Sequence, residues 1–183
     1  MHEGAAQSLR LGELHKWRDI MNIVLHEPGN PLNTGNIGRT CCATDTVLHL
    51  IEPMGFRLDQ KEIKRAGMDY WQHLDVRRYI NFQDFLQKNP GAKIYMATTK
   101  AHKVYTEVEY GENDFIMFGN ESRGIPEEIL VDYEDTCIRI PMGEKIRSLN
   151  LANSVAIVLY EALRQQNFAN LECNGELHRL NWK

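Results

Sequence analysis

The chain carries at residues 118–126 the stretch Phe118-Gly119-Asn120-Glu121-Ser122-Arg123-Gly124-Ile125-Pro126. An apolar run at 115–118 leads into it and has the character of a buried strand. A glycine, a carboxylate and an arginine follow, so ionic groups are delivered to the carboxyl end of that strand. Because open α/β sheets bind ligands outside the carboxyl ends of their strands, the stretch predicts an α/β fold with a site at this edge.

A second segment downstream predicts another wall of the same site. The sequence Ile140-Pro141-Met142 closes a strand and opens a loop, and Ser148-Leu149-Asn150-Leu151-Ala152-Asn153-Ser154 begins an apolar-periodic helix that extends to about residue 166. Ser148 is of the residue type that caps helices, and Asn150 and Asn153 fall in the expected first turn. We expect the two segments to outline one pocket.

Strands and helices alternate along the rest of the chain. The residue pattern predicts strands at 22–26, 47–51, 76–80, 93–98, 115–118 and 136–140, and helices at about 35–45, 59–66, 81–87 and 148–166. This alternation is typical of a mostly parallel sheet with helices on both faces. We expect one domain at 21–168, an N-terminal extension at 1–20 and a C-terminal tail at 169–183.

Composition narrows the class of protein. With 183 residues, 43% of them apolar, the chain can bury a sizeable core, and a net charge of −4 leaves room for a local basic patch. The sequence has neither an apolar run of roughly 18 residues nor a signal-peptide pattern, so we expect no membrane span and a cytoplasmic location. No disulfide or metal-ligand spacing relates the four cysteines, so we expect reduced thiols and no metal at Cys41, Cys42, Cys137 and Cys173.

The segment 33–39, Asn-Thr-Gly-Asn-Ile-Gly-Arg, is expected between the first strand and the first helix. It contains neither Gly-x-Gly-x-x-Gly nor the Lys-Ser/Thr pair of a P-loop, so we expect no dinucleotide or ATP site there. Taken alone, a plain turn with a solvated Arg39 explains the segment equally well. The presence of all three segments in this order favours a functional site over a plain turn.

Together the three segments resemble the motifs of the SPOUT methyltransferases: Asn33-x-x-Asn36-x-x-Arg39, the stretch at 118–126, and Ile140-Pro141-Met142 followed by Ser148-Leu149-Asn150-Leu151-x-Asn153. The resemblance extends over about 21–168. Finer details, including Ile51-Glu52-Pro53-Met54-Gly55-Phe56 and the short length, are similar to the TrmL group, the tRNA wobble-nucleotide 2′-O-methyltransferases.

The resemblance implies a fold whose C-terminal part is threaded into a trefoil knot and holds S-adenosylmethionine. It also implies a homodimer with active sites at the subunit interface, where Arg39 reaches the cofactor of the other chain. By similarity, the cofactor-binding residues are Ala97, Gly119, Ile140, Ser148 and Asn153. The catalytic candidates are Arg39, Glu121 and Asn150.

The chemistry assigns different roles to these candidates. A guanidinium is a poor base, so we expect Arg39 to bind the adjoining phosphate and stabilise the developing alkoxide. Glu121 is the one carboxylate of its motif, and it could serve catalysis or hold Arg123 or a backbone turn. The amides of Asn150 and Asn153 are suited to orienting ribose or the methionine carboxylate.

Basic residues that lie between the second and third predicted strands or, in one case, within the third are candidates for binding tRNA phosphates. They are Arg57, Lys61, Lys64, Arg65 and Arg77. A solvated helix face is the alternative, and nearby Tyr70 and Trp71 could stack on an unpaired base or belong to the core. Rival functions are a knotted RNA-binding protein without catalysis and a 2′-O-methyltransferase of rRNA or another tRNA position.

Overall fold

The computed structural model describes residues 21–57 and 69–182, which fold around a seven-stranded sheet. Its strands are β1 (Asn22–His26), β2 (Val47–Ile51), β3 (Val76–Tyr79), β4 (Ile94–Ala97), β5 (Lys103–Val104), β6 (Phe115–Phe118) and β7 (Cys137–Arg139). They lie in the order β3-β2-β1-β6-β4-β7-β5, and each neighbouring pair is parallel. The predicted α/β class is therefore confirmed.

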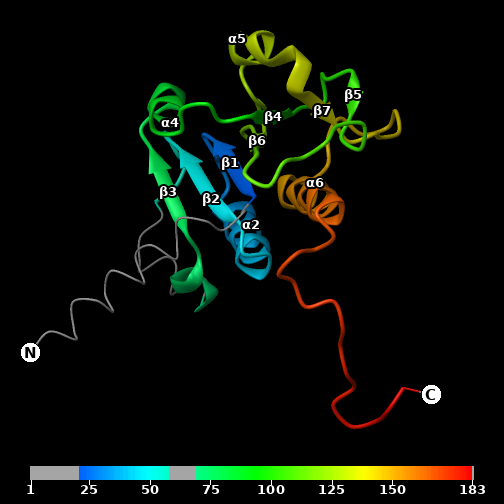
Figure 1. Ribbon diagram of the computed structural model, residues 1–183. Coiled ribbons are helices and arrows are strands. Elements are labelled where there is room, and N and C mark those ends of the chain that lie inside the picture. The colour runs from blue at the N-terminus through cyan, green and yellow to red at the C-terminus, as the bar shows by residue number, and fades with distance from the viewer. Residues whose placement is uncertain (1–20, 58–68, 183) are drawn as a thin grey trace, which may run out of the picture.

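Helices cover both faces of this sheet (Figure 1). They are α2 (Pro31–Ala43), α4 (Phe82–Lys88), α5 (Glu127–Leu130) and α6 (Leu151–Gln165), with the 3-10 helices η1 (Asp69–His73) and η2 (Val131–Thr136). In β1, Ile23 and Leu25 pack into the core that contains α2 and α6, whereas Val24 packs into the core that contains α4 and α5. Alternate side chains thus serve opposite faces, which explains why the three central residues of the strand are all apolar.

Helix α2 begins earlier than the sequence predicts. Asn30 caps it, because its Oδ1 accepts hydrogen bonds from the backbone N–H groups of Leu32 (2.9 Å) and Asn33 (3.4 Å), and Pro31 occupies the first helical position. The segment 33–39, which was expected to lead from the first strand into a helix beginning at about residue 35, therefore lies wholly inside the helix. Arg39 is about two turns into the helix rather than one.

Helix α6 begins later than the sequence predicts. Asn150, and not Ser148, is its N-cap: Oδ1 of Asn150 accepts from the backbone N–H groups of Ala152 (2.9 Å) and Asn153 (3.3 Å). The expectation of a helix from Ser148 is wrong by three positions, because the asparagine nearer the apolar periodicity takes the capping role. Residues 148–150 are consequently free of the helix and lie beside the site.

The later strands enter the sheet between earlier ones. β6 lies between β1 and β4, and β7 lies between β4 and β5. Three of the elements in this region were absent from the predicted set because each is short and lacks a clear period: β5, α5 and η2. None of the helices within 21–57 and 69–182 combines the length and apolarity that crossing a bilayer requires.

The structure describes the predicted C-terminal tail up to residue 182 but not the predicted N-terminal extension. The extension at 1–20 and the helix at 59–66 lie outside the described residues. The end of the chain after α6 leaves the body of the domain in Figure 1, and its apolar residues Leu177, Leu180 and Trp182 are exposed. The sequence allowed these side chains to pack onto the body of the domain or onto a partner chain, and their exposure does not support the first alternative.

A histidine is buried in the middle of β2. His49 is fully buried; its Nδ1 lies 2.8 Å from the Tyr79 hydroxyl and its Nε2 lies 3.0 Å from Oδ1 of Asn22. Burial lowers the pKa of His49 to about 3, with a further contribution from the Arg77 cation. The imidazole is therefore neutral in the folded protein and acts as a hydrogen-bonding member of the core.

Candidate functional site

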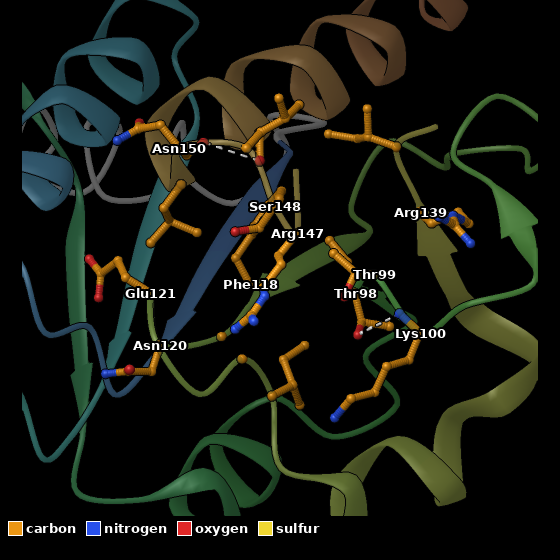
Figure 2. Close-up of a pocket in the computed structure, with 18 of the residues that line it drawn as sticks. Thr98, Thr99, Lys100, Phe118, Asn120, Glu121, Arg139, Arg147, Ser148 and Asn150 are labelled. Carbon is orange, nitrogen blue, oxygen red and sulfur yellow. Dashed lines mark hydrogen bonds between the residues drawn. The ribbon is translucent and has the colours of Figure 1, made fainter. Parts of the chain in front are cut away.

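A cleft of about 530 Å³ lies at the carboxyl ends of β4, β6 and β7 (Figure 2). Three stretches that are distant in sequence form most of its wall: 97–100, 118–125 and 147–151. Its apolar surface comes from Ala97, Phe118, Ile125, Ile138, Ile140, Met142, Leu149, Leu151 and Val158. The volume is that of a site for a small organic molecule, and the location is the one predicted from the sequence.

The turn after β6 depends on two glycines. A Cβ on Gly119 would lie 2.0 Å from the backbone carbon of Gly124, so this position admits no side chain. Gly124 has φ of +72°, a left-handed conformation that favours glycine, and its N–H donates to the carbonyl of Asn120 (2.8 Å). Oδ1 of Asn120 accepts from the N–H groups of Ser122 (3.0 Å) and Arg123 (3.3 Å). The backbone is thereby folded closely along one wall of the cleft.

Glu121 joins this turn to the start of α2. Its carboxylate accepts hydrogen bonds from the backbone N–H groups of Gly29 (2.8 Å) and Asn30 (3.2 Å) and from Nδ2 of Asn33 (3.2 Å). Figure 2 shows the carboxylate directed away from the middle of the cleft. The side chain is therefore engaged in fixing the helix that carries Arg39, and its partner is not Arg123.

Asn33 extends this connection to the third segment. Its Oδ1 accepts a hydrogen bond from Nδ2 of Asn150 (3.0 Å), while its own Nδ2 donates to Glu121. Asn33 is buried, and both the oxygen and the nitrogen of its side-chain amide have hydrogen-bond partners in the other two segments. The three segments singled out in the sequence thus meet through one chain of hydrogen bonds.

Four cations of the described chain line the cleft, and of these only Arg123 belongs to a segment singled out in the sequence. Lys100 pairs with Glu127 (2.7 Å), and Arg123 pairs with Glu27 (3.0 Å). Arg139 and Arg147 also line the cleft, and neither forms an ion pair with any carboxylate in the described ranges. Figure 2 shows Arg147 extending into the cleft. Its place directly before Ser148 was the available sequence signal.

The predicted cofactor residues divide into two groups. Ala97, Gly119, Ile140 and Ser148 line the cleft. Asn153 is exposed on α6 and is not among the lining residues.

Arg39 lies outside the cleft of its own chain. It is exposed on α2, and its guanidinium carbon lies 4.9 Å from the centre of the Tyr70 ring. Its two companions among the predicted catalytic residues, Glu121 and Asn150, do line the cleft.

The predicted RNA-binding residues are placed in part. Arg57 is exposed, and Arg77 is half-exposed and paired with Asp75 (2.9 Å). The three others, Lys61, Lys64 and Arg65, lie outside the described residues. Across the part of the chain that is described, no three His, Cys, Asp or Glu side chains are grouped so that they could hold a metal ion.

Known proteins resemble this chain over most of its length. Residues 20–160 match the SpoU rRNA Methylase family. A tRNA (cytidine(34)-2'-O)-methyltransferase from Aeromonas hydrophila is 44% identical over 152 residues, which cover 82% of this chain and 97% of that protein. The family match includes all three segments that meet at the cleft.

Solved structures of RNA methyltransferases are also similar to this chain. One described as giving structural insights into the 2-OH methylation of C/U34 on tRNA is 42% identical, with a TM-score of 0.76 over 81% of this chain and 97% of its own. An AdoMet-bound rRNA methyltransferase from Sinorhizobium meliloti is 26% identical, with a TM-score of 0.71 over 81% of this chain and 57% of its own.

Proposed function

Because the chain belongs to the SpoU rRNA methylase family, we propose that it is an S-adenosylmethionine-dependent methyltransferase acting on the ribose 2′-hydroxyl of the wobble nucleotide of tRNA. The predicted family is confirmed. The observation that carries the proposal is the meeting of the three motif segments at one cleft, where Asn33 bonds both Glu121 and Asn150. The wobble nucleotide of tRNA as the substrate is supported by the names of the similar proteins.

The cleft fits S-adenosylmethionine in chemistry and size. Apolar walls from Ala97 and Ile140 suit the adenine ring, the backbone at Gly119 offers polar groups without an intervening side chain, and Ser148 offers a hydroxyl. Arg147 is a cation suited to a carboxylate or a phosphate. When bound, the cofactor supplies a sulfonium methyl group that is already activated for transfer.

The protein must then orient the ribose hydroxyl and stabilise the charge that develops on its oxygen. We assign this role to Arg39, which binds the adjoining phosphate and faces the alkoxide, while the proton leaves to that phosphate or to water. The hydrogen bonds of Glu121 and Asn150 support positioning roles, because they fix α2 and α6 at the cleft.

A homodimer accounts for the position of Arg39, which does not line the cleft of its own chain. Large apolar side chains are exposed on α2 and α6, which pack against each other: Leu32 at 72%, Tyr160 at 47% and Ile157 at 37%. Burying these side chains against a second copy would remove apolar surface from water. In such a dimer Arg39 of each copy serves the cleft of the other.

The C-terminal trefoil knot also belongs to this proposal. Support comes from the family and from the sheet order, in which β6 and β7 enter between strands laid down earlier. The exposed Arg57, the half-exposed Arg77 and the cleft cations support an RNA-binding surface. The expected compartment is the cytoplasm, in keeping with four free cysteines.

The test is methylation of a panel of tRNA and rRNA transcripts, with mapping of the modified nucleotide. We expect 2′-O-methylation at the wobble position of tRNA. Modification of rRNA or of another tRNA position would overturn the substrate, and cofactor binding without methylation of any transcript would favour an RNA-binding protein that lacks catalysis.

A variant tests the assignment of Arg39. Arg39→Ala is expected to leave cofactor binding nearly intact and to abolish turnover. Lys88→Ala is the control, because Lys88 is an exposed cation on α4 that pairs with Asp84. Loss of cofactor affinity in Arg39→Ala, with the control unchanged, would mean that the role is misassigned.

A further inference from the structure

The short helix η1 is docked on α2 beside Arg39. Trp71 packs over Gly38, where an added Cβ would lie 2.6 Å from the indole ring. On the same side, Sγ of Cys42 lies 3.7 Å from the carbonyl oxygen of Tyr70. Contacts before and after Arg39 in the sequence therefore hold η1 against this stretch of the helix.

Tyr70 makes two contacts that converge on Arg39. Its hydroxyl donates a hydrogen bond to the carbonyl oxygen of Gly35 (2.6 Å), and in an α-helix that carbonyl also accepts from the backbone N–H of Arg39. Its ring lies under the guanidinium, whose carbon is 4.9 Å from the ring centre. Burial raises the pKa of Tyr70, although Arg39 opposes the rise, and the hydroxyl stays a donor at neutral pH.

The chemical nature of this partner matters for the arginine. Among the described residues no carboxylate pairs with Arg39, so the aromatic ring is its main neighbour. A carboxylate would hold the guanidinium but would also neutralise it and compete with a phosphate. An aromatic face restricts the side chain and leaves its full charge and its N–H donors available.

We propose that Tyr70 is a positioning residue for Arg39: it holds the guanidinium in one orientation on α2 without neutralising it. The inference rests on the proposed function, in which Arg39 acts on the ribose and its phosphate. A free arginine side chain samples many rotamers, and the unproductive ones must be excluded before transfer can occur, which costs conformational entropy. Because Tyr70 restricts Arg39 in advance, this entropy is not lost in the reaction step. Removal of Tyr70 therefore lowers the rate of methyl transfer and leaves substrate binding unchanged.

The experiment measures single-turnover methylation of the tRNA substrate by the full-length protein at saturating S-adenosylmethionine and tRNA. Tyr70→Leu removes both contacts, and Tyr70→Phe keeps the ring. Tyr133→Leu is the control, because Tyr133 is a half-buried tyrosine on η2 that packs against Phe82 instead.

We expect Tyr70→Leu to lower the rate about 10- to 100-fold, with dissociation constants for both substrates within about twofold of the unmodified protein. Tyr70→Phe recovers the rate to within about threefold, because the cation–π contact persists. Tyr133→Leu leaves the rate unchanged. If Tyr70→Leu fails to fold, Tyr70→Met fills more of the space and carries the same expectation.

Two results would overturn the inference. One is an unchanged rate in Tyr70→Leu while Arg39→Ala is inactive. The other is weaker tRNA binding in Tyr70→Leu with an unchanged saturated rate, which would make Tyr70 an RNA contact. Full activity of Arg39→Ala is a different failure, because it refutes the role of Arg39 in the proposed function itself.

Discussion

Nδ2 of Asn150 donates a hydrogen bond to Oδ1 of Asn33 over 3.0 Å, although 117 positions separate the two residues. Asn150 is at the same time the N-cap of α6, and Asn33 lies in the first turn of α2. One side chain therefore sets both where α6 begins and how it meets α2. The cleft between β6 and α6 depends on that placement.

Substitutions of Asn150 separate its two functions. Asn150→Ser keeps a capping oxygen but is too short to reach Asn33, so we expect a loss of about 1 kcal/mol in the free energy of unfolding. Asn150→Ala removes the cap as well and is expected to cost about 2 kcal/mol. Urea unfolding measures both. Asn153→Ala, in the same turn, is the control, and equal losses in the two Asn150 variants would contradict the separation.

Replacement of Glu121 distinguishes a structural carboxylate from a catalytic one. Three N–H donors converge on it, and the single oxygen of a glutamine cannot serve donors at both carboxylate oxygens. We expect Glu121→Gln to lower the free energy of unfolding by about 1–3 kcal/mol. Its methylation rate, measured where the variant is folded, should stay within about tenfold. Normal stability with a complete loss of rate would instead identify a general base.

A methyl group at Gly119 is expected to distort the turn after β6. Its Cβ would lie 2.0 Å from the backbone of Gly124, which a side-chain rotation cannot relieve. Gly119→Ala should therefore lose most S-adenosylmethionine affinity in calorimetric titration. Gly143→Ala is the matched control, since a Cβ there meets no atom within 4 Å. Normal affinity in Gly119→Ala would show that this turn does not shape the cofactor site.

Much of this architecture could be predicted from the sequence. Strands β1 and β2 are buried at every position, so their segments 22–26 and 47–51 are mostly apolar on both faces, with a polar residue only at Asn22, His26 and His49. The cleft could also be predicted, because its glycines and ionic residues directly follow β6.

Helix boundaries and side-chain partners could not be predicted in the same way. Ser148 and Asn150 both suit an N-cap, and only the position of the first packed turn decides between them. The sequence left catalysis, Arg123 and a backbone turn open as roles for Glu121, yet its partners are 88 to 92 positions away. Contacts of that kind depend on tertiary packing, which a local pattern does not encode.

The buried His49 predicts a specific dependence of stability on pH. Its pKa is about 3 in the folded protein, against 6.5 for a histidine side chain that is not buried. Between these values the unfolded chain binds a proton that the folded protein does not, so the free energy of unfolding falls as the pH falls. The slope approaches about 1.4 kcal/mol per pH unit well below pH 6.5, and a drop from pH 7 to pH 5 costs about 2 kcal/mol. Above about pH 7 the effect becomes negligible.

Urea unfolding of His49→Gln between pH 5 and pH 7 tests this, because glutamine keeps hydrogen-bonding capacity but does not titrate in that range. The unmodified protein should lose about 2 kcal/mol more than the variant over the interval, since the other titrating groups are common to both. His102→Gln, at an exposed histidine, should follow the unmodified protein. Parallel curves for the unmodified protein and His49→Gln would mean that His49 accepts a proton in the folded state, and its bonds to Tyr79 and Asn22 would need reassignment.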